Sequence, residues 1–209
     1  IDKKKIVSLY GPSHAEEVLK GFPTTLVSAS IDDKTSILIQ DVFSSDVLRI
    51  YTNNDLKGVE LGGSLKNVIA IATGICDGIG FGDNTKAALL TRGMAEITRL
   101  GTSMGAKEST FSGLSGIGDL IATCLSEHSR NRHVGEEIGK GKSLSKILDD
   151  MDMVAEGVKT TRSVFDLSKK YNLDMPISEG VYKILFDNEN PKSIVSELMN
   201  RDLVDESKK

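Results

Sequence analysis

The spacing of apolar residues changes at Asp55, and this change limits the possible folds more than any other feature of the sequence. Beyond it, apolar residues recur at intervals of about 3.6, which is typical of helices, and no segment has the composition of a strand. The sequence therefore predicts an all-helical domain over residues 55–209. Its helices are expected over 55–80, 84–100 and 109–124, and later ones from Ser143, near Glu156, near Pro176 and from Pro191.

Residues 1–54 follow another pattern, in which short apolar strands alternate with helices. Ser13 and Glu16 fit a capping box that opens a short helix, and a second helix follows Asp33. This alternation predicts a mainly α chain whose start is a partial α/β, Rossmann-type segment. Three strands leave an open sheet edge, and the chain begins with Ile1 rather than Met, so we expect upstream sequence to complete the sheet. The strands are expected over 5–10, 24–30 and 47–51.

Charge and composition argue against several classes of protein. A net charge of −4 and a pI near 5.5 disfavour a nucleic-acid partner held by a broad basic surface. There is no apolar run of about 18 residues and no N-terminal signal segment, so neither a membrane span nor secretion is predicted. Two cysteines supply neither a disulfide framework nor a zinc set, which fits the cytoplasm. His128 and His133 do not share a helix face, so no metal site is predicted.

Lys66 is the first candidate for chemistry, because it lies in an otherwise apolar helix. Gly58, Gly62 and Gly63 precede it, and each glycine inside a helix costs roughly 1 kcal/mol relative to alanine. Two explanations are open: close approach of another helix, or clearance for a ligand beside the Lys66 ammonium, since Gly62 would share its face. Asn67, a polar residue directly after Lys66 within the apolar run, favours the ligand site.

A second polar group follows about fifty residues later, at spacings i, i+4, i+7 and i+11. If one helix continued through it, these residues would form a single stripe. Their flanking residues are apolar, so the stripe is expected to face a polar cavity rather than bulk water. Ser129-Arg130-Asn131 adds a planar cation that can grip a phosphate with two hydrogen bonds. The stripe consists of Asp119, Thr123, Ser126 and Arg130.

Three further features carry weaker signals. The turn Gly11-Pro12-Ser13 lies at a helix N-terminus, where free N–H groups favour an anion, although a plain cap explains it equally well. The segment GLSGIG (113–118) lacks the spacing of a dinucleotide-binding loop and follows no strand. Arg92 and Glu96 are expected to form a structural i,i+4 pair.

Taken together, several segments resemble the bacterial NAD(P)-dependent glycerol-3-phosphate dehydrogenases. The family consists of an N-terminal Rossmann domain and an all-helical substrate domain, similar to the C-terminal domain of 6-phosphogluconate dehydrogenase. The resemblance spans nearly the whole chain in order, but the family's GxGxxG fingerprint and the lysine of its TKG segment are absent from residues 1–209. The segments are GPSHAEE (11–17), the long stretch 51–101 with ELGGSLKN, TFSGLSGIGDLIATC (110–124), SRNRHVG (129–135) and VAEGVKTT (154–161).

The resemblance assigns a role to each matching residue. Lys66 matches the catalytic lysine, and Asn67, Asp119 and Thr123 match other residues of the catalytic site. Substrate-binding positions are matched by Gly11, Ser13, Lys66, Asp119, Ser129, Arg130 and Asn131. Positions beside the dinucleotide are matched by Ala15, Arg130, Val154 and Glu156.

The resemblance implies the interconversion of sn-glycerol 3-phosphate and dihydroxyacetone phosphate with NAD or NADP, which supplies glycerol 3-phosphate for phospholipid synthesis. In the reducing direction, we expect Lys66 to act as the acid, oriented by Asp119. A non-catalytic phosphate-binding fragment, a helical interaction domain and a dehydrogenase of another hydroxyacid remain alternatives. The expected partner is a phosphorylated small molecule, with a cytoplasmic location; a homodimer and the choice between NAD and NADP stay open.

Overall fold

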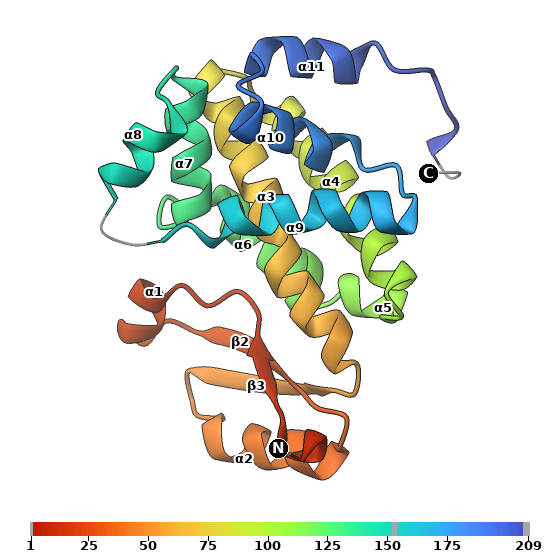
Figure 1. The fold of residues 1–209 in the computed structure, drawn as a ribbon. Coiled ribbons are helices and arrows are strands. Elements are labelled where there is room, and N and C mark those ends of the chain that lie inside the picture. Colours follow the sequence, from red (N-terminus) through yellow and green to blue (C-terminus); the bar gives the residue numbers. More distant parts are fainter. Residues whose placement is uncertain (1, 152–153, 207–209) are drawn as a thin grey trace.

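The computed structural model describes residues 2–151 and 154–206, which form a small sheet beside a bundle of helices (Figure 1). The long helix α3 (Leu56–Ile79) begins near the sheet and runs through the middle of the bundle. Before α3 come a 3-10 turn (Lys3–Lys5), β1 (Ser8–Tyr10), α1 (Ala15–Leu19), β2 (Thr24–Ala29), α2 (Asp33–Phe43) and β3 (Leu48–Asn53). After it come α4 (Asp83–Ser103), α5 (Glu108–Phe111), a π-helical turn (Leu114–Gly118), α6 (Asp119–Leu125), α7 (Arg130–Gly139), α8 (Leu144–Asp149), α9 (Glu156–Tyr171), α10 (Pro176–Phe186) and α11 (Pro191–Met199).

The mainly α fold with a partial α/β segment is therefore confirmed. The division into domains at 54 and 55 stays a prediction, and residues 1, 152–153 and 207–209 of those ranges lie outside the described residues.

The sheet has the order β1-β2-β3, with one antiparallel and one parallel pair. β2 and β3 are parallel, as a strand–helix–strand unit requires, and α2 connects them. β1 runs antiparallel to β2, because α1 has only five residues and Gly21, with a φ of 73°, turns the chain back. The strand–helix alternation predicted from the sequence is confirmed, but its first unit is not a parallel crossover.

The start of α1 differs from the predicted capping box. The N-cap is His14, whose side chain makes no capping bond, and the Ser13 hydroxyl donates instead to the carbonyl of Gly11 at 3.1 Å. Gly11 has a φ of 145°, and a Cβ there would lie 3.0 Å from the carbonyl oxygen of Thr25. This glycine turn directs the Ser13 side chain backward along the chain, so it cannot cap the helix.

The long helix α3 has the predicted bounds because both of its ends are capped. The Asp55 carboxylate accepts from the backbone N–H of Gly58 at 3.0 Å, and Gly80, with a φ of 92°, ends the helix in the left-handed conformation. Among the described residues, α3 alone has the length and apolar composition of a membrane-spanning helix. The most apolar 18-residue stretch of α3 is 78% buried inside the protein, so the position of α3 in the core accounts for its apolar composition.

Helices α3 and α7 pack in close contact through glycines on both. A Cβ at Gly74 would lie 1.9 Å from the carbonyl oxygen of Arg132, and one at Gly135 would lie 2.0 Å from that of Ile71. One turn further along, a Cβ at Gly78 would lie 2.1 Å from the carbonyl oxygen of Glu136, and one at Gly139 would lie 2.5 Å from that of Ile75. This contact holds the N-terminus of α7 beside the middle of α3, where Lys66 and Asn67 lie.

Replacement of Gly135 by alanine is expected to lower the free energy of unfolding by about 1–3 kcal/mol, because backbone on a packed helix must move to admit the methyl group. Urea denaturation followed by circular dichroism measures this change. Gly118→Ala is the matched control, since its Cβ would meet neighbours only at 3.7 Å or beyond. Equal stability of the Gly135 variant and the wild type would contradict the close packing.

The predicted helix over 109–124 consists of three shorter pieces. Gly113 has an extended backbone that separates α5 from the π-helical turn, and a Cβ at Gly116 would lie 2.0 Å from the carbonyl oxygen of Phe111. The expected continuation through Arg130 is also wrong, because α6 ends at Leu125 and α7 begins at Arg130. The helix α7 itself was not predicted, since its sequence RNRHVGEEIG has few apolar residues.

Glu96 has a structural role, whereas its pairing with Arg92 stays a prediction. Its buried carboxylate accepts from the backbone N–H groups of Ile177 and Ser178, at 2.7 and 3.0 Å, and from the Ser178 hydroxyl at 2.7 Å. It therefore anchors the first turn of α10 to α4.

Candidate functional site

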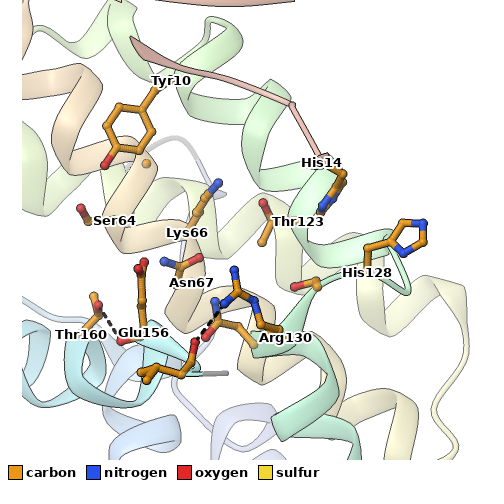
Figure 2. A pocket seen from close by; sticks show the side chains of 14 residues that line it. Tyr10, His14, Ser64, Lys66, Asn67, Thr123, His128, Arg130, Glu156 and Thr160 are labelled. Atoms are coloured by element: carbon orange, nitrogen blue, oxygen red, sulfur yellow. Dashed lines mark hydrogen bonds between the residues drawn. The ribbon is translucent and has the colours of Figure 1, made fainter. Parts of the chain in front are cut away.

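A polar cavity of about 250 Å³ lies where α3, α6, α7 and α9 meet the end of β1 (Figure 2). Figure 2 shows Lys66, Asn67, Thr123 and Arg130 directed toward a common space, although they come from three helices. The cavity is lined by Tyr10, His14, Gly63, Ser64, Lys66, Asn67, Thr123, His128, Ser129, Arg130, Asn131, Val154, Glu156 and Thr160.

Lys66 forms an ion pair with Asp119 on the floor of this cavity. The Lys66 Nζ donates to Asp119 Oδ1 at 2.5 Å, and the Thr123 hydroxyl donates to the same oxygen at 3.3 Å. The Asp119 side chain is only 3% exposed, whereas that of Lys66 is 16% exposed and reaches the cavity. Asp119 therefore holds one N–H of the ammonium and leaves the others to a ligand.

The charged form of the Asp119 carboxylate is destabilised by burial. Burial raises its pKa above the ordinary value, and the nearby Lys66 ammonium only partly opposes this. Its second oxygen, Oδ2, makes no hydrogen bond to any of the described residues. A buried, half-satisfied carboxylate is destabilising for the fold, and its position against Lys66 indicates a functional reason for keeping it.

The segment Ser129-Arg130-Asn131 forms the wall opposite Lys66. Ser129 is the N-cap of α7 and accepts from the backbone N–H of Arg132 at 3.3 Å. Among the described residues, the Arg130 guanidinium makes one long hydrogen bond, 3.4 Å to the carbonyl of Val154, so it has donors left for a ligand. Asn131 uses its side-chain oxygen to accept from Gly157 N at 2.8 Å, which ties α7 to α9.

The start of α9 supplies an acidic group to the same cavity. Glu156 lines it, and the Glu156 carboxylate makes no hydrogen bond within the described part of the chain. Val154, just before α9, is 64% exposed beside it. Asn67 is buried, and its side-chain amide has no partner within residues 2–151 and 154–206, so it too can bind a ligand.

The structure brings together eight of the predicted site residues on the cavity, and Asp119 acts on it through Lys66. Three predicted residues do not line the cavity: Gly11, Ser13 and Ala15. Gly11 is buried against β2, whereas Ser13 and Ala15 are exposed to solvent. Their roles stay predictions. Ser126, the remaining member of the predicted stripe, lines a neighbouring cavity instead. The eight residues are Lys66, Asn67, Thr123, Ser129, Arg130, Asn131, Val154 and Glu156.

The glycines before Lys66 serve close packing. A Cβ at Gly62 would lie 2.5 Å from the carbonyl oxygen of Ser115, so Gly62 packs against backbone. The expectation that Gly62 borders the ligand site, drawn from the helix face that it shares with Lys66, is therefore wrong. A Cβ at Gly63 would lie 2.2 Å from the ring of Tyr10. Gly63 thus lets Tyr10 into the cavity, where burial raises the pKa of the Tyr10 hydroxyl.

Sequence reasoning missed five residues that line the cavity. Three of them lie inside segments that carry the resemblance: His14 in GPSHAEE (11–17), Ser64 in the stretch 51–101 and Thr160 in VAEGVKTT (154–161). The other two, Tyr10 and His128, directly precede such segments and have no local signal for a ligand. The five are Tyr10, His14, Ser64, His128 and Thr160.

Comparison with known proteins places the chain in a family. Residues 55–196 match the family described as NAD-dependent glycerol-3-phosphate dehydrogenase C-terminus. Two relatives from Salinibacter ruber, both called glycerol-3-phosphate dehydrogenase [NAD(P)+], are 56% and 57% identical over 96% of this chain. The chain covers 58% and 59% of their lengths, so it spans less than two thirds of these relatives.

Solved structures agree with this assignment. The glycerol-3-phosphate dehydrogenase of Coxiella burnetii is 39% identical, with a TM-score of 0.90 over 93% of this chain and 60% of that one. A structure from Dunaliella salina is 27% identical, with a TM-score of 0.84 over 91% of this chain and 34% of that one. The chain belongs to the family of the NAD-dependent glycerol-3-phosphate dehydrogenase C-terminus.

Proposed function

We propose that this chain forms the substrate-binding and proton-transferring part of an enzyme that interconverts sn-glycerol 3-phosphate and dihydroxyacetone phosphate with NAD or NADP. The observation that carries the proposal is the Lys66–Asp119 ion pair, which presents an ammonium to a polar cavity opposite Arg130. The names of the relatives and the family match support the choice of reaction.

The residues of this chain would act on the two ends of the substrate. Arg130, with the Ser129 hydroxyl and the free N–H groups at the start of α7, binds the phosphate. Asn67 can bind a substrate hydroxyl. In the reducing direction, the Lys66 ammonium polarises the carbonyl oxygen and donates a proton to it, and in the oxidising direction the Lys66 amine removes the hydroxyl proton. Asp119 holds Lys66 in position throughout.

A nicotinamide cofactor supplies or accepts the hydride in this reaction. The residues present fit its nicotinamide end. The Glu156 carboxylate, which has no hydrogen-bond partner among the described residues, can accept from the carboxamide, and Val154 offers apolar surface next to it. Arg130 borders both this region and the phosphate region through its contact with the Val154 carbonyl. Ala15, which lies on α1, stays a prediction.

Three other predictions come from the sequence and the resemblance. They are a cytoplasmic location, a role in supplying glycerol 3-phosphate for phospholipid synthesis, and a homodimer as one open choice of oligomeric state. Sedimentation analysis would check the homodimer, and cell fractionation would check the location.

The proposed activity can be tested with a chimaera that joins the N-terminal part of a Salinibacter ruber relative, upstream of the matched region, to this chain. We expect NAD(P)H-dependent reduction of dihydroxyacetone phosphate by the chimaera and none by residues 1–209 alone. Positioning the cofactor against the substrate can supply roughly 7–11 kcal/mol of barrier lowering, and residues 1–209 contain no GxGxxG loop for this purpose.

Two outcomes would count against the proposal. Turnover by residues 1–209 alone would require a nucleotide site that the sequence reading missed. A folded chimaera that binds glycerol 3-phosphate without turnover would favour the alternative, a non-catalytic phosphate-binding fragment.

A further inference from the structure

Two of the three histidines of the chain line the cavity, and the proposed proton transfer uses neither. His14 precedes α1, and His128 lies in the turn between α6 and α7. Their ring centroids are 6.0 Å apart (Figure 2). Both rings also line a second cavity, of about 620 Å³, between α1 and α6. The two imidazoles thus form a boundary of the Lys66 cavity on the side where α1 meets the α6–α7 turn.

A contact of His14 with a backbone carbonyl determines which of its two ring nitrogens binds and releases the hydrogen when the ring changes charge. Its Nε2 lies 3.3 Å from the carbonyl oxygen of Ala122, which can only accept a hydrogen bond. Nε2 therefore carries a hydrogen in both charge states of the ring, and Nδ1 is the atom that gains or loses one. The neutral ring presents a lone pair at Nδ1, which repels an anion, whereas the protonated ring presents an N–H donor.

Both permanent charges and titratable ones surround this pair. Arg130 lies two residues from His128 and shares the cavity with both imidazoles, so an anion between them would meet a fixed cation as well. Histidine is the side chain whose charge ordinarily changes between about pH 5 and 8. The facing charged and titratable groups are Tyr10 on β1, Glu16 and Glu17 on α1, Lys66 on α3, Asp119 on α6, Glu127 in the turn, Arg130 and Arg132 on α7, and Glu156 on α9.

We propose that His14 and His128 form a protonation-dependent anion-binding pair that holds the phosphate group of the substrate together with Arg130. The choice of a phosphate monoester rests on the proposed function, whereas the binding of a divalent anion rests on the cavity alone. The pair makes the binding of a dianion stronger as the pH falls, because each protonated imidazole adds a positive charge and a hydrogen-bond donor.

Sulfate is a suitable probe, because it stays a dianion over the pH range in which a phosphate monoester titrates, near pH 6. We expect the chain to bind sulfate about tenfold more tightly at about pH 5.5 than at about pH 8, as two partly exposed charge pairs would give. Calorimetry measures the affinity. NMR of the three histidine rings, in the same samples, shows which of them respond.

His133 provides the matched control, since it lies on α7, is exposed and does not line the cavity. Added sulfate is expected to move the titration midpoints of His14 and His128 to higher pH and to leave that of His133 in place. His14→Gln and His128→Gln each reduce the pH dependence of sulfate binding, and His133→Gln does not. Equal responses of all three rings, or no response of His14 and His128, would overturn the proposal even if a variant failed to fold.

A comparison of ligands separates this inference from the proposed function. Glycerol 3-phosphate is expected to bind more tightly than inorganic phosphate, because its hydroxyl groups reach Lys66 and Asn67. If the two histidines respond to sulfate while glycerol 3-phosphate binds no better than phosphate, the pair stands and the proposed substrate is wrong. If glycerol 3-phosphate binds better and the histidines do not respond, the pair is wrong and the proposed function is unaffected.

Discussion

Replacement of Lys66 by methionine in the chimaera is expected to lower kcat for dihydroxyacetone phosphate reduction by about 10²–10⁴-fold, the usual contribution of a positioned general acid. Methionine fills a similar volume without a proton to donate. The loss should appear in kcat more than in KM, because Arg130 and the start of α7 still hold the phosphate.

Steady-state kinetics of NADH oxidation measure this effect. Lys159→Met is the matched control, since Lys159 is exposed on α9 outside the cavity, and we expect it to leave kcat unchanged. A Lys66 variant with kcat within about tenfold of the wild type would mean that another group or water donates the proton.

Replacement of Asp119 by asparagine is expected to change activity and stability in opposite directions. Turnover falls by about 10²-fold, because Lys66 loses the carboxylate that orients it, and small misplacements of reacting groups have effects of this size. The free energy of unfolding at neutral pH rises by about 1 kcal/mol, because the variant no longer buries a charge. Lys66 reaches the cavity, so water can solvate its ammonium in the variant.

The pH dependence of this stability difference has a defined sign. Burial raises the pKa of Asp119 in the folded protein, so the folded state takes up a proton at higher pH than the unfolded state. Protonation of Asp119 therefore stabilises the wild type at acid pH, and this stabilisation is lost as the pH rises through the folded-state pKa. The advantage of the asparagine variant is largest at neutral pH and disappears below the ordinary aspartate value of 3.8.

Urea denaturation of the chain at several pH values measures this difference. The control is Asp166→Asn, because Asp166 is exposed on α9 and its replacement should leave the stability unchanged at every pH. A less stable asparagine variant at neutral pH would show that the Lys66–Asp119 attraction outweighs the burial of the carboxylate.

Parts of the fold that depend on local signals were predictable from the sequence. Helix α3 has a regular apolar period and capping residues at both ends, so its bounds could be predicted within a residue. Proline at the first turn marked the starts of α10 and α11 in the same way. In contrast, α7 packs against α3 through Gly135 and Gly139, and its few apolar residues give no regular apolar period from which the helix could be predicted.

The candidate site was predictable to a similar extent. Lys66 and Asp119 could be found as polar residues within apolar helical segments, and the structure places them in direct contact. Val154 and Glu156 were indicated only by resemblance, because residues just before and at the start of a helix carry no local signal for a ligand. Tyr10 enters the cavity only because Gly63, more than fifty residues later, leaves room for its ring.

A crystal structure of the chain with glycerol 3-phosphate would test the central claim most directly. We expect the phosphate on Ser129, Arg130 and the start of α7, and the oxygen on the central carbon within about 2.6–3.2 Å of Lys66 Nζ. A ligand bound elsewhere, or one in this cavity with its phosphate away from Arg130 and its central oxygen out of reach of Lys66, would contradict it.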